Sequence, residues 1–425
     1  MKLALGITVL ISLSACVLYL VYLARWWRKE AKSVPMQIAA GVESYRRLMS
    51  SNEHFQRPDP SVLSRLEPLI VYQELGGTRL SFEPNYRKFI SLWSFAPTVD
   101  ATYVCLEVLR LLKCDEFFTE ARAQQCRSFL SSCLVKGAAF AIGRDTNFSS
   151  IYATNCAVGI VKSLEGIPCG NPLVGSEAAK ETMSSDTVEG IVRFLRSCRE
   201  ESSALLVDNG QPAAEPELNT TYTAHHILWN LGRADLFYTE MVERERLQAF
   251  ILAGFYRTDF MGFPYDGSSA RGCMCAARFA LRLLSTCGDL FTLVPAEART
   301  KILRFVEAFR DKESGGFYAV AGDTPSLYAT YFALDICSIL QVELKDKERT
   351  LDFVRSCKKG KAFAFSEGLT PNPFASRYAV QVLSLLGQKG MDLVRTYRQD
   401  LTDFITGDLY ERDQGCFWGF PPRRT

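Results

Sequence analysis

The hydrophobic pattern of the chain repeats with a period of about fifty residues. Six segments are apolar on most sides, with an aromatic residue or Met near the start and small residues one turn later. A helix packed on two sides has this composition. Equivalent positions lie 49, 70, 52, 54 and 50 residues apart, at Tyr103, Tyr152, Tyr222, Met274, Tyr328 and Tyr378. The pattern predicts six helices that form an inner layer.

A more amphipathic segment follows each of these six, with charged residues on one face. Such a pattern is typical of helices with one solvated side. The predicted outer helices are 116–134, 187–198, 239–255, 296–309, 345–357 and 391–406. Glycine-aromatic turns follow most of them, as in Gly315-Gly316-Phe317. Glycine permits the tight turn and the aromatic ring can insert between helices. A polar loop, 202–218, lies in the longest interval.

Strict alternation of six inner and six outer helices predicts an all-α fold, an α6/α6 toroid. Each hairpin can bury its inner helix against its neighbours, and closure removes the open ends. An open solenoid is the alternative, but the terminal segment 415–421 is suited to plug a closed ring. The expected ring surrounds a cavity. Its candidate lining residues are Tyr103, Tyr152, Tyr222, His225, Tyr328, Tyr331 and Tyr378.

The N-terminal segment 3–24 contains no charged residue. About 22 residues in a helix span about 33 Å, enough to cross a bilayer. Lys2 precedes this segment, whereas four basic residues follow it between Arg25 and Lys32, beside Trp26 and Trp27. The positive-inside rule then predicts a single-pass anchor in the lipid bilayer, with the body on the cytosolic or mitochondrial matrix side. The mitochondrial inner membrane and the endoplasmic reticulum are not distinguished.

Two other interpretations compete with a retained anchor. Leu13-Ser14-Ala15-Cys16 matches a lipoprotein cleavage box, although the following residues remain apolar. Asn147 and Asn219 begin glycosylation sequons, which matter only for a luminal body. We therefore divide the chain into an anchor with its basic flank (1–32), a linker with leading helices (33–79) and the toroid (80–425).

Charge and cysteine content limit the functions that we expect for this chain. The 425-residue chain has 49 basic and 47 acidic residues and a net charge of +2, and no basic stripe is interleaved with aromatics. Nucleic-acid binding is therefore not expected. The 14 cysteines are scattered without metal-ligand spacing. We interpret them as buried thiols in a reducing compartment.

On its glycine-aromatic turns and the helices that follow them, the chain resembles the β subunit of protein prenyltransferases. It resembles terpene cyclases, which share the α/α toroid, more distantly. The resemblance covers residues 80 to 421 and is carried by Gly315-Gly316-Phe317 with Tyr328, and by Met261-Gly262-Phe263 with Cys273. It implies the toroid fold and, in the family, transfer of a prenyl group to a protein thiol.

The residues required for that chemistry are not matched. The resemblance implies a zinc site made by an Asp-x-Cys and a His at the starts of successive inner helices. The Asp-x-Cys falls on Arg271 and Cys273, and the His falls on Ala329. The family also places an Arg and a Lys in the preceding turn, where they neutralise the diphosphate. Residues 264–270 hold Asp266 and no cation.

Other constellations lead to no stronger hypothesis. A rebuilt zinc site could combine His225 and His226 with Cys273 and Cys275, but neighbouring histidines, and cysteines two apart on a helix, point in different directions. Three histidines leave little basis for a nucleophile relay, and no Asp-x-Asp-Asp cluster suggests a cyclase. Asp145, Asp266 and Asp323 each precede an inner helix, where capping is the expected role. Paired acids for glycoside chemistry are not singled out.

The sequence therefore predicts a membrane-anchored toroid with a degenerate active site. We expect it to act as a scaffold or accessory subunit with protein partners in a membrane complex, and we expect no cofactor and assign no catalytic residue. The alternatives are a divergent protein prenyltransferase or isoprenoid-processing enzyme, and a toroid that binds a lipid in its cavity.

Overall fold

The computed structural model describes residues 97–144, 149–166, 183–201, 203–208, 216–255, 263–264, 272–319, 324–419 and 421, with the backbone alone at 263, 264 and 272. The chain divides into two compact units, Met1–Gly77 and Thr78–Thr425, and every described residue belongs to the second. The predicted anchor at 3–24 lies outside the described residues. No helix in the described ranges is both long and apolar enough to span a membrane.

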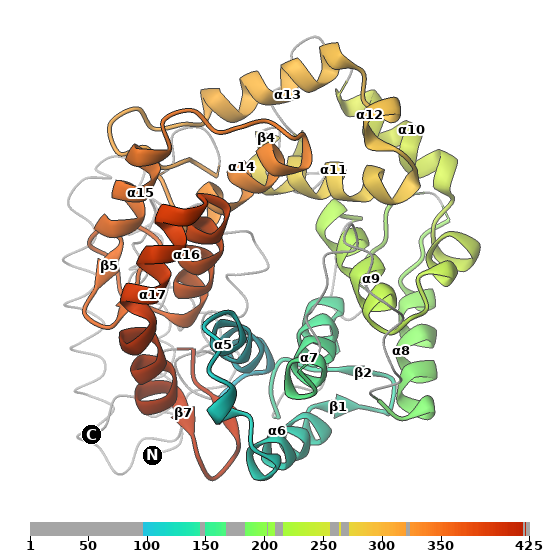
Figure 1. Ribbon diagram of the computed structural model, residues 1–425. Helices are drawn as coiled ribbons and strands as arrows, with labels where there is room; N and C mark the ends of the chain where they lie inside the picture. Colours follow the sequence, from blue (N-terminus) through green and yellow to red (C-terminus); the bar gives the residue numbers. More distant parts are fainter. Residues whose placement is uncertain are drawn as a thin grey trace, which may run out of the picture. The chain divides into compact units, whose positions relative to one another are not determined.

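Six helices of the second unit form the predicted inner layer (Figure 1). Each begins at or next to the apolar segment that predicted it. Their bounds are α5 (Val99–Leu111), α7 (Ile151–Leu164), α9 (Leu218–Asn230), α11 (Met274–Cys287), α14 (Leu327–Ile339) and α16 (Pro373–Leu385). Ten of the 14 residues of α11 and ten of the 13 residues of α14 are buried, which fits helices that are covered on both sides.

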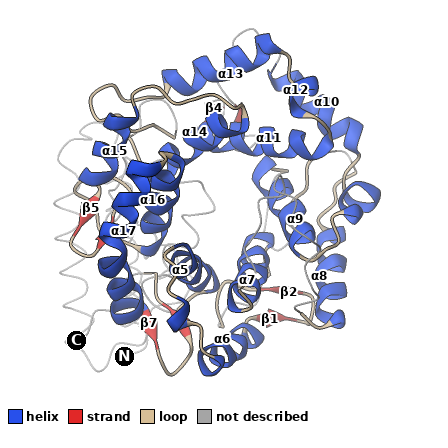
Figure 2. Ribbon diagram, in the orientation of Figure 1, coloured by secondary structure: helices blue, strands red, loops and turns tan. Residues whose placement is uncertain are grey.

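The outer layer consists of six helices that alternate with the inner ones along the chain (Figure 2). They are α6 (Glu120–Ser132), α8 (Ser185–Ser197), α10 (Arg244–Phe255), α13 (Ala296–Ala308), α15 (Lys347–Ser356) and α17 (Gln388–Asp403). Short elements join them: η2 (Asp115–Phe117), the π-helix η3 (Phe237–Met241), α12 (Leu290–Leu293) and the π-helix η4 (Phe404–Leu409). The predicted helix at 239–255 is therefore two elements, η3 and α10.

The inner helices form a closed ring. Each packs on the next, from α5 to α16, and α16 packs back on α5. The terminal turn completes the closure, because the amide of Phe417 donates to the Thr102 hydroxyl at 3.1 Å and the Cys126 thiol donates to the Gly415 carbonyl. The α6/α6 toroid is confirmed, and the open solenoid is excluded.

One hydrogen bond recurs in five of the six repeats. The fourth residue of the inner helix is Thr or Ser, and its hydroxyl accepts from a backbone amide. For four helices this amide lies in the segment before the helix, and for α5 it lies in the last turn of the chain. The pairs are Phe417 with Thr102, Phe140 with Thr154, Leu206 with Thr221, Phe317 with Thr330, and Phe363 with Ser376. In α11 the fourth residue is Ala277. The repeat that begins with Cys273 therefore lacks this bond.

Short antiparallel hairpins occupy most of the glycine-aromatic turns. They are β1 (Leu134–Val135) with β2 (Ala139–Phe140), β3 (Phe263–Pro264) with β4 (Gly272–Cys273), β5 (Lys358–Lys359) with β6 (Ala362–Phe363), and β7 (Tyr410–Glu411) with β8 (Cys416–Phe417). Phe317 pairs with Arg310 and Ser326 in isolated bridges. The aromatic rings of Phe317, Phe363 and Phe417 are fully buried, as predicted for residues inserted between helices.

Glycine is required at two close approaches. Gly315 adopts φ +80°, and a Cβ there would lie 2.6 Å from Arg349 of α15. Gly159 lies on α7 against Tyr103 of α5, where a Cβ would lie 2.4 Å from the tyrosine ring. The first glycine permits the turn to approach the outer layer, and the second lets two inner helices pack closely.

Candidate functional site

The resemblance implies zinc ligands at Arg271, Cys273 and Ala329, and the structure describes the last two. Cys273 is the N-cap of α11, with an extended backbone (φ −122°, ψ 137°), and it is buried. Ala329 lies in the first turn of α14, where it is fully buried and its amide donates to the Ser326 hydroxyl at 3.2 Å. Arg271 lies outside the described residues.

Cys275 lies beside Cys273, contrary to the expectation that cysteines two apart diverge. Their Sγ atoms are 2.8 Å apart. The expectation assumed that both residues are helical, but α11 begins at Met274 and Cys273 is extended. The change of backbone conformation between the two residues turns the first side chain towards the second.

The donor set at these positions does not fit the zinc site of the resembling enzymes. Cys273 supplies one thiolate, whereas a methyl group stands at Ala329 and a guanidinium at Arg271. Within the described ranges, no group of three or more His, Cys, Asp and Glu residues could hold a metal ion. Among the described residues, His225 and His226 do not join these cysteines in such a group, since His226 contacts Asn155 and His225 packs against Phe237.

The fifth and ninth residues of the inner helices lie one turn apart on the same helix face. At these positions the side chains of neighbouring inner helices contact one another, and we call them the inner belt. The inner belt comprises Tyr103, Glu107, Asn155, Gly159, Tyr222, His226, Arg278, Arg282, Tyr331, Asp335, Arg377 and Gln381. The ion pairs and hydrogen bonds between its members link the six helices in three pairs, and ring contacts also cross between the pairs.

The first pair of helices, α11 and α14, is joined by two arginines on one carboxylate. Arg278 Nε lies 2.6 Å from one oxygen of Asp335, and Arg282 donates to both oxygens. Burial alone would raise the pKa of Asp335, but the two guanidinium groups hold that pKa below its usual value. The carboxylate is thus charged and shared between Arg278 and Arg282.

Aromatic rings surround the first of these arginines. The guanidinium carbon of Arg278 lies 5.2 Å from the ring centres of Tyr222 and Phe279, and 5.3 Å from that of Phe332. Cation-π attraction at such distances is strengthened where water is excluded, and the Arg278 side chain is 11% exposed. Arg278 is therefore held by Asp335 and by rings of three inner helices.

The second pair, α16 and α5, is joined in a similar way. Arg377 Nε lies 2.6 Å from Glu107 Oε2, and the Gln381 amide donates to Glu107 Oε1 at 3.3 Å. The Arg377 guanidinium lies 5.4 Å from the Tyr103 ring centre and 5.7 Å from that of Tyr378. Burial is the largest single influence and lowers the pKa of Arg377, but Glu107 together with the neighbouring tyrosines outweighs it, and the net direction is upward.

The third pair, α7 and α9, is joined by an imidazole and a side-chain amide. His226 Nδ1 lies 2.8 Å from Asn155 Oδ1, and the ring of Tyr222 stacks on His226 with centroids 6.1 Å apart. His225 turns away from this contact and packs edge-on against Phe237 of η3 at 4.9 Å. Its Nδ1 has no hydrogen-bond partner among the described residues, and burial lowers the pKa of His225 to about 4. His225 thus lies between α9 and η3.

The remaining candidate lining residues lie on α7, α14 and α16. Tyr378 contacts Tyr328 at 5.4 Å and Tyr331 at 5.6 Å between ring centres. Tyr152 is half-buried in the first turn of α7. Aromatic residues of α14 and α16 are therefore gathered, but the cavity that they were expected to line stays a prediction.

Sequence reasoning missed the charged members of the inner belt. Glu107, Arg278, Arg282, Asp335 and Arg377 lie on segments that were read as apolar. A signal was available, because these residues occupy the fifth or ninth position after each helix start, and Arg278 with Arg282 and Arg377 with Gln381 are spaced by four. Aligning the repeats on the helix starts would have placed them on one face.

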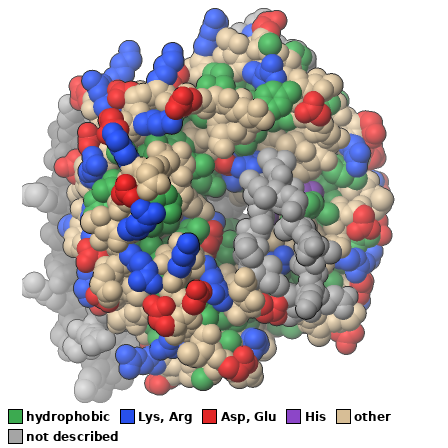
Figure 3. Space-filling view, in the orientation of Figure 1, with side chains coloured by type: hydrophobic (Ala, Val, Ile, Leu, Met, Phe, Trp, Pro, Cys, Tyr) green, Lys and Arg blue, Asp and Glu red, His purple; other side chains and the backbone are tan. Residues whose placement is uncertain are grey.

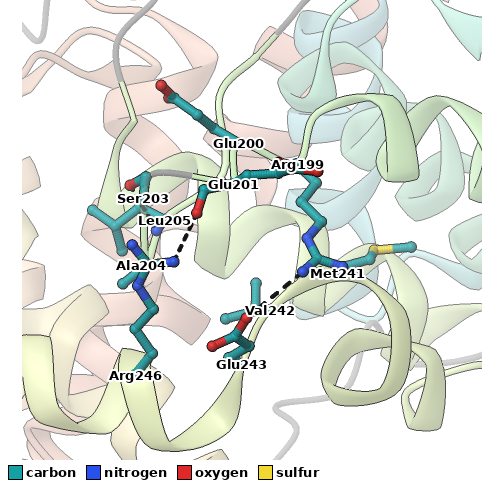
Figure 4. Close-up of a pocket in the computed structure, with 10 residues that line it drawn as sticks. All are labelled: Arg199, Glu200, Glu201, Ser203, Ala204, Leu205, Met241, Val242, Glu243 and Arg246. Atoms are coloured by element: carbon teal, nitrogen blue, oxygen red, sulfur yellow. Dashed lines mark hydrogen bonds and ion pairs between the residues drawn. The ribbon is translucent and has the colours of Figure 1, made fainter.

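A surface pocket lies elsewhere, between the end of α8 and the start of α10 (Figure 4). Arg199, Glu201, Met241, Glu243 and Arg246 are among its lining residues. Its two arginines already have partners, since Arg246 donates to the backbone carbonyl of Glu201 at 2.8 Å and Arg199 lies 3.7 Å from Glu243. None of the inner-belt residues lines this pocket.

Comparisons with known proteins agree with the ring. The family model described as the prenyltransferase alpha-alpha toroid domain matches residues 89–286 and 268–406. A solved Candida albicans protein geranylgeranyltransferase-I, complexed with GGPP, matches with a TM-score of 0.51 and 15% identity, over 81% of this chain and 99% of that one. This likeness shows the fold alone. No match was found among curated proteins. With three quarters of its length matched by the family model, the chain belongs to the prenyltransferase alpha-alpha toroid domain family.

Proposed function

We propose that this chain is a non-catalytic member of its family, held at a membrane by residues 3–24, which acts as a scaffold or accessory subunit of a membrane-associated complex. One observation carries the proposal. Ala329 stands where the resemblance implies the family's zinc-binding histidine, and it is a fully buried methyl group that cannot ligate a metal. Zinc is required in the resembling enzymes to activate the acceptor thiolate.

The charges of the inner belt support the same proposal. A leaving diphosphate needs cations that are free to neutralise it. Arg278 and Arg282 share Asp335, and Arg377 is paired with Glu107. Binding a diphosphate to these arginines would require breaking ion pairs that are buried or half-buried, and a buried pair that loses one partner costs about 3–5 kcal/mol.

The outer surface supports association with proteins rather than with nucleic acid. On the face shown in Figure 3, Lys and Arg side chains are interspersed with Asp and Glu, and no large field of one sign is present. The whole chain has a similar balance of charge, with 49 basic and 47 acidic residues. Specific partners of such a surface are other proteins or the bilayer to which the anchor binds.

Purification of the full chain from membranes in mild detergent tests the proposal. We expect a stable complex with other proteins, no zinc by elemental analysis, and no transfer of farnesyl or geranylgeranyl groups to cysteine peptides. Carbonate extraction should leave the chain in the membrane, and deletion of residues 3–24 should release it. A monomer that carries stoichiometric zinc and transfers a prenyl group would overturn the proposal.

Restoring the ligands provides a sharper test of the lost zinc site. The double variant Arg271→Asp with Ala329→His keeps Cys273 and re-creates the family's donor set. We expect its zinc content to rise from none to about one ion per chain. Adding Cys273→Ser should abolish this gain, and Ala329→His alone should give little. A folded double variant without zinc, judged by circular dichroism, would show that these positions do not correspond to the family's site.

Binding of an apolar or lipid-like ligand is the second candidate function. The observation that favours it is the group of aromatic rings from α9, α11 and α14 around Arg278, which could hold a lipid chain and its polar end. Native mass spectrometry of the detergent-purified chain should then show a bound lipid, and the Arg278→Met variant should lose it. The third candidate function is that of a divergent prenyltransferase. It requires bound zinc, and the Cys273→Ser variant should then lose that zinc.

A further inference from the structure

The sulfur atoms of Cys273 and Cys275 have an environment that differs from that of other described cysteines. Their Sγ atoms lie 2.8 Å from each other. Several other thiols contact oxygen, as Cys198 does with the Phe194 carbonyl and Cys357 with the Phe365 carbonyl. A direct contact between two thiols is the arrangement from which a disulfide can form.

The local backbone produces this contact. Cys273 is the N-cap of α11, with extended backbone angles, and Cys275 is the second residue of the helix. In four inner helices, an N-cap Ser, Thr or Asn side chain accepts a hydrogen bond from the first turn, as Ser326 does from Ala329. Cys273 makes no such capping bond. Its side chain is instead directed to the thiol of Cys275.

The remaining step to a bond is short. A disulfide has an S–S length of about 2.04 Å, so the two sulfurs at 2.8 Å need to approach by about 0.8 Å. Side-chain rotation can supply a movement of this size without moving α11. Both residues are buried, with 6% of Cys273 and none of Cys275 exposed. Cys273 is therefore the thiol that an oxidant reaches first.

We propose that Cys273 and Cys275 form a redox-active dithiol that closes to an intramolecular disulfide when a small-molecule disulfide, such as oxidised glutathione, is available. The Cys273 thiolate attacks one sulfur of the oxidant, and one thiol leaves. The Cys275 thiolate then attacks Cys273 Sγ in the mixed disulfide, and the second thiol leaves. Two protons and two electrons pass from the protein to the oxidant, which is reduced to two thiols.

Closure has a consequence for the helix. The disulfide would tie the N-cap residue to the first turn of α11 and replace, by a covalent bond, the capping hydrogen bond that this helix lacks. It would also remove Cys273 as a thiolate ligand. A position that serves metal binding in the resembling enzymes would here carry a reversible modification.

Peptide mapping tests the proposal on the full-length, detergent-purified chain. Trypsin cleaves after Arg271 and Arg278, and the peptide between them contains Cys273 and Cys275 but no other cysteine. The reduced protein is equilibrated with mixtures of reduced and oxidised glutathione, free thiols are alkylated under denaturing conditions, and the peptide is weighed. We expect an unalkylated peptide about 2 Da lighter than the reduced one, through the loss of two hydrogens.

The same titration in denaturant is the control for the fold. We expect the equilibrium constant for closure to be at least about tenfold higher in the native chain, because the fold holds the sulfurs together. Equal constants in the two states would overturn the proposal. So would a native peptide that is doubly alkylated at every glutathione ratio, or one that carries glutathione on each cysteine.

Single variants provide matched controls that do not depend on the native titration. In Cys273→Ser and Cys275→Ser, the remaining thiol should be alkylated or glutathionylated, and the lighter peptide should disappear. A disulfide from either remaining thiol to a cysteine outside the peptide would contradict the assigned pair. If a variant fails to fold, the comparison of native and denatured wild-type protein still decides the question.

Discussion

At the residue scale, the buried hydroxyl at the fourth position of the inner helices explains how each repeat is fixed to its turn. Thr330 is fully buried, and its hydroxyl is the acceptor for the amide of Phe317. Without this hydroxyl, the buried backbone N–H of Phe317 would have no hydrogen-bond acceptor. In α11 the fourth residue is Ala277, which has no hydroxyl to accept this bond. The N-cap of the same helix is Cys273. Two departures from the pattern therefore coincide at the candidate site.

Replacing Thr330 by Val tests this role. The two side chains have similar shapes, so that the variant removes the hydroxyl and leaves the Phe317 amide unsatisfied. We expect the free energy of unfolding to fall by about 1–3 kcal/mol. Thr300 lies exposed on α13 and provides the control, since Thr300→Val should change stability by less than about 0.5 kcal/mol. Urea denaturation followed by circular dichroism measures both, and equal losses would contradict the argument.

His225 should make stability depend on pH. Burial lowers its pKa to about 4 from an ordinary value of 6.5, so that between these values the unfolded chain binds a proton that the folded chain does not. The free energy of unfolding should therefore decrease as the pH falls from 6.5 to 4, by about 3 kcal/mol in total. Above pH 6.5 this contribution vanishes.

Denaturation curves at pH 7 and pH 4.5 measure the effect. His225→Leu should remove most of this loss, because the side chain no longer titrates. His226→Leu keeps His225 and should therefore keep the loss. A pH dependence that is identical in the wild type and His225→Leu would show that His225 does not control it.

At the scale of elements, the paired helices show what could and could not be predicted from the sequence. The amphipathic and apolar segments predicted the helices, because a helix that is buried on one or both faces carries apolar residues at the buried positions. The charged residues of the inner belt were not predicted in this way. Arg278 and Asp335 are 57 residues apart and belong to helices that become neighbours only in the ring. No local pattern contains that pairing.

Asp335→Asn tests the ion pairs that join α11 and α14. The variant leaves Arg278 and Arg282 buried without an anion, and unpaired buried charges are costly. We expect stability to fall by about 3–5 kcal/mol. Asp392 forms an exposed pair with Arg395 on α17, and Asp392→Asn should cost less than about 0.5 kcal/mol. Thermal and urea denaturation compare the two. Similar losses would show that the α11–α14 pair contributes no more than a surface contact.

At the scale of the whole molecule, the period of about fifty residues was enough to predict the ring, because six hairpins with alternating burial have few ways to cover their inner helices. The short strands of the turns were not predicted. Strands such as β5 and β6 have two residues each, too few for an alternating pattern to be visible. The contact between Cys273 and Cys275 also escaped prediction, because it depends on where α11 begins, and helix starts are uncertain by one or two residues.

The closing bond between Phe417 and Thr102 also has a consequence for synthesis. The two residues are separated by 315 positions, and the last glycine-aromatic turn supplies the partner that the first inner helix needs. A nascent chain that has left the ribosome up to α15 therefore holds α5 with one flank uncovered and its Thr102 hydroxyl without that amide. The first repeat can be completed only after the last one has been translated, so that a chaperone has a natural target on α5 until then.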